Sequence, residues 1–151
     1  MNAEKKVNAA SVSYIEKNVF IVWKPEYDLG IPIIDEQHRG VVTIINTLYF
    51  AMKNDYIGAM LSPIIEMITS YTHIHFKVEE DFFIKSEFPQ AKNHHNLHCE
   101  LIDKLSSISR RSILDNDPHQ FMDFLKTWWI SHICNEDMLY RNYLLSLPKT
   151  E

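Results

Sequence analysis

Glycine is scarce in this chain: the 151 residues include only Gly30, Gly40 and Gly58, which stand far apart. A phosphate-binding loop or a dinucleotide fingerprint needs glycines a few residues apart, because the backbone must approach the ligand closely. Neither motif occurs in this sequence. The usual nucleotide-binding chemistries are therefore excluded.

Cysteine and positive charge are also in short supply. The two cysteines, Cys99 and Cys134, are too far apart for a C-x-x-C pair and too few for a disulfide framework. We expect reduced, buried and inert thiols in a cytoplasmic protein. Acidic residues outnumber basic ones by 20 to 15, for a net charge of -5, which argues against a nucleic-acid partner. The apolar run Val19 to Trp23 is too short for a signal peptide or a membrane span, so no membrane partner is expected either.

Apolar residues recur at steps of three and four along most of the chain, which predicts helices. The expected helices cover residues 35 to about 55, 62 to 88, 89 to about 108, and 117 to 147. Ser62 would cap the second helix with Pro63 at its first position, and Asp117 with Gln120 forms a capping-box signature for the fourth. The sequence thus predicts an all-α fold: an N-terminal arm (1–22), a loop, and an up-down-up-down four-helix bundle within residues 23–147.

Polar side chains interrupt the apolar stripes of all four predicted helices. The inward positions are occupied by His38 on the first helix, His75 and Glu79 on the second, His94 and His98 on the third, and His132 on the fourth. Residues four apart lie on one face of a helix, so each pair can serve one site. Burying so many polar groups without partners would cost about 1 to 3 kcal/mol each, a cost that a bound metal removes.

The donor types and their number predict two metal ions. Imidazole and carboxylate without thiolate suit iron, zinc, manganese or copper. Five histidines, Glu79 and one acid from the fourth helix are too many donors for one ion. That acid has two candidates: Glu136 lies four residues after His132, whereas Asp137 lies five after it, about 140° around an α-helix. Helical geometry favours Glu136, and spacing alone leaves the choice open.

The fourth helix is predicted to be one continuous α-helix ending before Pro148. Its expected inward stripe, counted in steps of three, four and seven, consists of Phe121, Leu125, Trp128, His132 and Leu139.

Four blocks occur in a fixed order: Ile34-Asp35-Glu36-Gln37-His38, then His75-x-x-x-Glu79, His94-x-x-x-His98 and His132-x-x-x-x-Asp137. Together they resemble the motifs of the hemerythrin family, especially its bacterial members, over roughly residues 23–145. The resemblance implies two non-heme iron ions bridged by carboxylates and by an oxo or hydroxo group. It also selects Asp137 over Glu136. The implied ligands are three histidines on one iron, two on the other and two bridging carboxylates: His94, His98 and His132; His38 and His75; Glu79 and Asp137.

With these ligands one iron keeps an open position, and the resemblance implies reversible dioxygen binding there, for carriage, storage or delivery. Azide, nitric oxide and peroxide are further candidate ligands. We expect a binding protein rather than an enzyme, because no outstanding proton donor falls on the inward faces. The alternatives are an oxygen or redox sensor, a di-iron oxidase, peroxidase or nitric oxide reductase, and an iron buffer. The sequence identifies no protein partner.

The other polar and aromatic residues near these motifs have simpler interpretations. His73, His95 and His119 are expected at the surface. Glu80 is expected to be a solvated acid, with a role as partner to a histidine ligand as the alternative. Trp129 departs from the aliphatic residue common in the family, and its bulk would alter ligand access if it lay in the dioxygen pocket.

Overall fold

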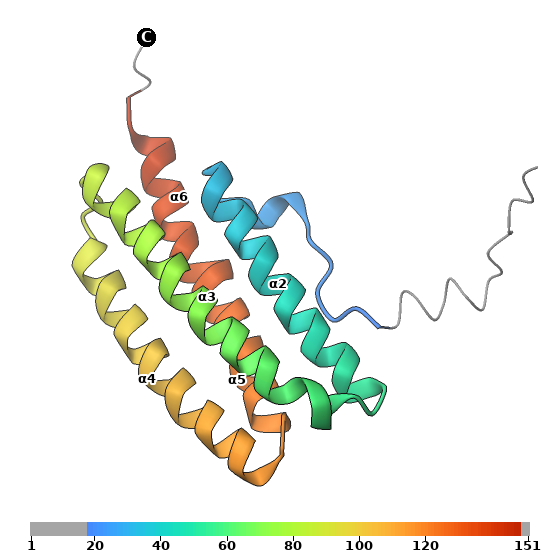
Figure 1. Ribbon diagram of the computed structural model, residues 1–151. Coiled ribbons are helices and arrows are strands. Elements are labelled where there is room, and N and C mark those ends of the chain that lie inside the picture. The colour runs from blue at the N-terminus through green and yellow to red at the C-terminus, as the bar shows by residue number, and fades with distance from the viewer. Residues whose placement is uncertain (1–17, 149–151) are drawn as a thin grey trace, which may run out of the picture.

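The computed structural model describes residues 18–148, and every regular element in that range is helical (Figure 1). The helices form four rods that pack together. Three of the rods are single helices: α2 (Pro32–Lys53), α3 (Ile57–Lys85) and α4 (Ala91–Asp115). The fourth rod consists of α5 (His119–Trp128), a π-helical segment (Trp129–Glu136) and α6 (Asp137–Ser146). Successive rods pack side by side, and α2 also packs against α5. The predicted four-helix bundle is confirmed.

The interior contains two apolar clusters with a polar layer between them. The larger cluster includes Ile45 of α2, Ile68 of α3 and Leu125 of α5, all fully buried. The smaller one includes Phe83 of α3 and Tyr140 of α6. Along each rod the inward histidines and carboxylates lie between these two sets. None of the helices within residues 18–148 is long and apolar enough to cross a membrane.

The first long helix begins three residues before its predicted start at Asp35. Pro32 occupies the first turn, where its missing N–H is not needed. Asp35 lies within that turn and accepts the backbone N–H groups of Leu29 and Gly30. Gly30 has a φ of 90°, a conformation that favours glycine. The carboxylate of Asp35 thus ties the preceding loop to the helix.

The predicted start of the second helix at Ser62 and Pro63 is wrong. α3 begins at Ile57, and Pro63 lies inside it. Leu61 is buried in the larger apolar cluster, and this packing holds the extra turn in place. The proline removes only one intrahelical hydrogen bond near the helix start, which tertiary packing can offset.

The fourth rod departs most from the prediction. The expected capping box does not form: Pro118 is the N-cap, and Asp117 accepts the backbone N–H of His119 at 2.9 Å instead. Beyond Trp128 the backbone is π-helical for eight residues before it returns to an α-helix at Asp137. The π-helical segment therefore shifts the register of everything after it by one residue.

Part of the predicted N-terminal arm lies outside the described residues, which begin at residue 18. The described part runs along α2 and is held there by Asn46. The side-chain oxygen of Asn46 accepts the N–H groups of Phe20 and Ile21, at 2.9 and 2.8 Å, and its amide nitrogen donates to the carbonyl of Ile21. The boundary between arm and bundle at residue 22 stays a prediction.

Candidate metal centre

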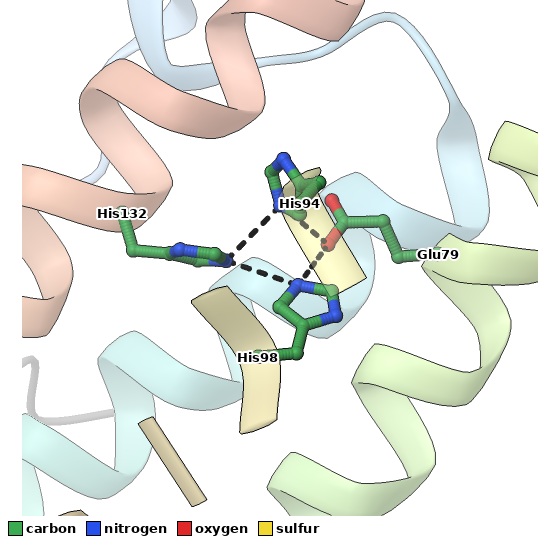
Figure 2. Close-up of side chains that lie close together, drawn as sticks. All are labelled: Glu79, His94, His98 and His132. Atoms are coloured by element: carbon green, nitrogen blue, oxygen red, sulfur yellow. Dashed lines mark hydrogen bonds and ion pairs between the residues drawn. The ribbon is translucent and has the colours of Figure 1, made fainter. Parts of the chain in front are cut away.

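All seven side chains predicted as metal ligands come together in the polar layer. They form two groups that share Glu79, and in each group the ligand atoms lie within 4.8 Å of one another. The first group is Glu79, His94, His98 and His132 (Figure 2). The second group is His38, His75, Glu79 and Asp137. Each of the seven side chains is at most 3% exposed.

The three histidines of the first group converge through their Nε2 atoms. Figure 2 shows His132 facing His94 and His98 from the opposite rod. Its Nε2 lies 3.3 Å from that of His94 and 3.1 Å from that of His98. Nitrogens bound to one ion at about 2.1 Å and at right angles stand about 3.0 Å apart. The spacing of the three nitrogens therefore fits one metal ion.

The two carboxylates lie between the histidine sets. Glu79 Oε2 is 3.1 Å from His98 Nε2. Asp137 reaches both sets: its Oδ1 is 3.0 Å from His94 Nε2, and its Oδ2 is 3.3 Å from His38 Nε2. Asp137 thus has one oxygen toward each histidine set, and Glu79 belongs to both groups, so both carboxylates could contribute to two ions.

The polar atoms of the second group lie close together without satisfying one another. Seven atoms of this group are buried and have no hydrogen-bond partner among the described residues. They are both ring nitrogens of His38, the Nε2 of His75, and the four carboxylate oxygens of Glu79 and Asp137. Buried polar groups are normally paired, and leaving one unpaired costs about 1 to 3 kcal/mol. His38 Nε2 and Asp137 Oδ2, for example, are 3.3 Å apart without forming a hydrogen bond. This is the arrangement that bound cations would satisfy.

Burial keeps the imidazoles in the form that binds metals. It lowers the pKa of His98 to about 3, helped by the neighbouring His132. It also lowers the pKa of His132 to about 4, although Asp137 acts in the opposite direction. Burial and the nearby His38 bring the pKa of His75 well below its usual value. At neutral pH these rings are uncharged, and a ring nitrogen lone pair is available to a metal.

The two carboxylates are electrostatically unequal. Burial, followed by the charges of Asp137 and Glu80, raises the pKa of Glu79 well above its usual value. Burial would also raise the pKa of Asp137, but His132 and His38 hold it well below its usual value. Two facing carboxylates cannot both be ionised cheaply in a buried layer. Divalent cations between them would remove that repulsion.

The π-helical segment decides which acid of the fourth rod enters the centre. The backbone N–H of Asp137 donates to the carbonyl of His132, five residues earlier. This winding brings residues five apart onto one face, so Asp137 is fully buried whereas Glu136 is only partly buried. The geometric preference for Glu136 assumed an α-helix and is wrong.

A profile of the Hemerythrin HHE cation binding domain matches residues 29–144. The chain belongs to the hemerythrin family. It is therefore a hemerythrin-type cation-binding protein, and its buried histidine and carboxylate groups suit a site for two metal ions.

Relatives of this hemerythrin chain occur in bacteria and in a protist. A bacteriohemerythrin of Clostridium acetobutylicum is 32% identical over 125 residues, which cover 79% of this chain and 97% of that protein. A bacteriohemerythrin of Stenotrophomonas maltophilia is 26% identical over 121 residues, covering 80% of this chain and 78% of that protein. A hemerythrin-like protein of Naegleria gruberi is 26% identical over 122 residues, covering 81% of this chain and 92% of that protein.

Two residues behind the hemerythrin ligands escaped the main sequence interpretation. Glu80 is not a freely solvated acid: its Oε1 lies 2.8 Å from His98 Nδ1, as the alternative interpretation expected. The side-chain oxygen of Gln37 lies 3.1 Å from His75 Nδ1. Each lies next in sequence to a predicted ligand, and that adjacency was the only available signal.

The remaining histidines and cysteines of the hemerythrin chain are only partly as predicted. His73, His95 and His119 are exposed, which confirms the prediction. Cys99 and Cys134 are both free, but the prediction that both are buried is wrong, since Cys99 is exposed and Cys134 is only half-buried. Both lie one residue from the inward face of a helix, and that offset does not ensure burial.

Trp129 packs against aromatic residues of the N-terminal loop in this hemerythrin chain. Its ring meets Tyr27 and Trp23 edge-on, with ring centroids 5.2 and 6.0 Å apart. It joins the N-terminal loop to the π-helical segment. Its neighbour Trp128 instead faces Phe76, one residue after His75 in the bundle interior.

Proposed function

We propose that this protein binds two iron ions and uses one of them to bind dioxygen reversibly, for carriage, storage or delivery. The observation that carries the proposal is the unequal division of histidines between two groups that share Glu79, with Asp137 in reach of both histidine sets. With one oxygen from each carboxylate and one shared oxo or hydroxo group, three imidazoles would complete six ligands on one ion. Two imidazoles with the same number of oxygen ligands would give the other ion five, which would leave a position open for a small ligand.

The donors and the relatives support iron as the metal. Imidazole with carboxylate suits iron, and the absence of thiolate disfavours a structural zinc site. Bacterial relatives that cover most of the chain are named bacteriohemerythrin. When bound, a pair of ferrous ions supplies an open coordination position and electrons that can be lent to dioxygen and returned.

The chain's own contribution is to hold and seal the centre. His38, His75, Glu79 and Asp137 have no exposed surface. The ring of Phe76 lies flat against His98, with centroids 3.7 Å apart and planes 2° from parallel. Exclusion of water in this way protects a bound small molecule from protons and hydrolysis.

The proposal is of a binding protein rather than an enzyme. Catalytic turnover of dioxygen or peroxide requires a proton donor beside the open position. Among the described residues, the buried acids and phenols other than the predicted ligands are Asp35 and Tyr140. Asp35 binds backbone amides of the loop, and the Tyr140 hydroxyl is paired with Ser86 at 2.9 Å and with a backbone carbonyl.

Metal analysis with anaerobic reduction and re-exposure to dioxygen tests the proposal. We expect two irons per chain and an absorption band that appears with dioxygen and disappears when dioxygen is removed. Zinc in place of iron, or a rapid irreversible return to the oxidised state, would overturn it in favour of a structural site or an oxidase. Azide should compete with dioxygen, because both need the same open position.

A further inference from the structure

Two predicted ligands, His98 and His75, have chemically different hydrogen-bond partners at Nδ1, the ring nitrogen opposite Nε2. The Nδ1 of His98 faces the carboxylate of Glu80 at 2.8 Å. The Nδ1 of His75 faces the side-chain amide oxygen of Gln37 at 3.1 Å. His98 belongs to the three-histidine group and His75 to the two-histidine group. In the three-histidine group the Nδ1 of His98 thus has a charged acceptor, whereas in the two-histidine group the Nδ1 of His75 has a neutral one.

Both contacts fix the same ring tautomer. A carboxylate oxygen and an amide oxygen only accept hydrogen bonds, so each Nδ1 must carry the hydrogen. The Nε2 of each ring is then left with its lone pair facing the centre. For His75 this agrees with the buried and unpaired state of its Nε2.

Glu80 is itself firmly placed. The same Oε1 that accepts from His98 also lies 2.9 Å from the Nδ1 of His95, one turn earlier on α4. The Glu80 side chain is 22% exposed, so water screens it only in part. With Phe76 stacked on one face of His98 and Glu80 at its rear nitrogen, the ring has little freedom to turn.

The charge difference between the two partners has a direct chemical consequence. A hydrogen bond from Nδ1–H to a carboxylate is stronger than one to a neutral amide, and it raises the basicity of the opposite nitrogen more. His98 should thus donate more strongly to its metal than His75 does to the other. Partners of this kind change metal affinity by about 10- to 100-fold when mutated.

We propose that Glu80 and Gln37 are positioning residues that increase the difference in strength between two metal positions that already differ by one histidine. Glu80 strengthens the hold of the three-histidine position, and Gln37 leaves the two-histidine position the weaker of the two. The inference rests on the proposed di-metal site but not on dioxygen binding. It also implies an order of loading, with the three-histidine position filled first.

Zinc release to a chromogenic chelator tests the proposal without any redox chemistry. The wild-type chain loaded with two zinc ions should lose them in two phases, and the His75→Ala variant identifies the slower phase as that of the three-histidine position. Glu80→Gln keeps a hydrogen-bond acceptor but removes the charge, and should speed the slow phase about tenfold or more. Asp81→Asn removes a charge from the next residue of α3, where Asp81 pairs only with Lys85 at the surface, and should leave both phases unchanged.

The reciprocal substitution, at Gln37, tests the two-histidine position. Gln37→Glu places a carboxylate behind His75 and should slow the fast phase, whereas Thr43→Glu, an exposed position on α2, should not. The His98 Nδ1–H proton resonance of the zinc-loaded chain should move upfield in Glu80→Gln, as its hydrogen bond weakens. A purely structural role would leave that resonance in place.

The outcomes separate this proposal from the proposed function. If wild-type binds two zinc ions but Glu80→Gln and Gln37→Glu release them at wild-type rates, the positioning roles are wrong and the di-metal site stands. If wild-type binds fewer than two ions, the proposed function fails as well. Equal acceleration by Glu80→Gln and Asp81→Asn would reduce the effect of Glu80 to general surface charge and overturn its role.

Discussion

The backbone amide of Asp137 donates its hydrogen bond to the carbonyl of His132, five residues earlier, and the side chains of both residues enter the metal centre. In an α-helix the amide would bond to Ile133, and the acid facing the centre would be Glu136. The Asn135 side chain donates to the carbonyl of Ile130 within the same π-helical segment. The choice between two neighbouring acids thus depends on backbone winding rather than on side-chain chemistry.

Removal of the Asp137 charge should impair metal binding, whereas removal of the Glu136 charge should not. Asp137→Asn keeps the size of the side chain but loses a buried anionic ligand, so we expect loss of about one metal ion per chain or an affinity at least about tenfold lower. Glu136→Gln is the matched control. Metal content after dialysis, measured by mass spectrometry, decides between them. Loss of metal in Glu136→Gln alone would show that the rod is α-helical in solution.

The histidines should divide sharply into ligands and surface residues. His98→Ala removes a ring that is 1% exposed and lies at the three-histidine position, so at least one metal should be lost. His73→Ala lies on the same bundle but is exposed, and its metal content should equal that of wild-type. Equal losses of metal in both variants, again measured by mass spectrometry, would contradict the assignment of His98 to the inward face and of His73 to the surface.

A methyl group at Gly40 should destabilise the bundle. A Cβ built there would collide with the hydroxyl and ring of Tyr71 on α3, and overpacking of this kind costs about 1 to 3 kcal/mol. Alanine returns about 1 kcal/mol of this cost through its higher helix propensity, so we expect a net loss of up to about 2 kcal/mol. At Gly58, in the first turn of α3, nothing lies within 4 Å of a Cβ. Gly58→Ala should therefore be neutral or stabilise by up to about 1 kcal/mol, since alanine favours the helix. Urea unfolding of the metal-free chains measures both. A Gly40→Ala chain as stable as wild-type would mean that α2 and α3 can move apart freely.

The link between the loop and α2 should depend on Asp35. Asp35→Ala leaves the N–H groups of Leu29 and Gly30 without their acceptor, and we expect a loss of about 1 to 3 kcal/mol in the free energy of unfolding. Glu36→Ala removes an ion pair with Arg39 at the surface and should change stability by less than about 0.5 kcal/mol. Urea unfolding again provides the measurement. Equal effects would show that the loop contributes little to the folded state.

The sequence predicted the bundle and six of its seven converging side chains because these follow from periodicity, whereas Asp137 was selected by the family resemblance. Helices of twenty or more residues repeat their pattern many times, so a local ambiguity at one end does not alter the inward face. His75 and Glu79, or His94 and His98, fall on that face wherever their helix begins. The start of α3 could be placed wrongly at Pro63 without moving either residue.

What could not be predicted depends on interactions between elements. The switch to π-helical winding after Trp128 changes which backbone groups pair, and single-chain periodicity assumes that pairing in advance. The partnership of Glu80 with His98 requires the register of α3 against α4, which no spacing within one helix reveals. The exposure of Cys99 has the same origin: no neighbouring rod covers that side of α4.

The one-residue shift at the π-helical segment also determines where the last helix can be altered. Counted from α5 as a continuous helix, Leu139 would be interior and Tyr140 would face outward. In the structure Leu139 is 41% exposed and Tyr140 only 1%. A spectroscopic probe or an immobilising tether can therefore be attached at position 139, two residues after Asp137 of the candidate metal centre, without opening the bundle. Any redesign of α6 must be numbered from Asp137 rather than from α5.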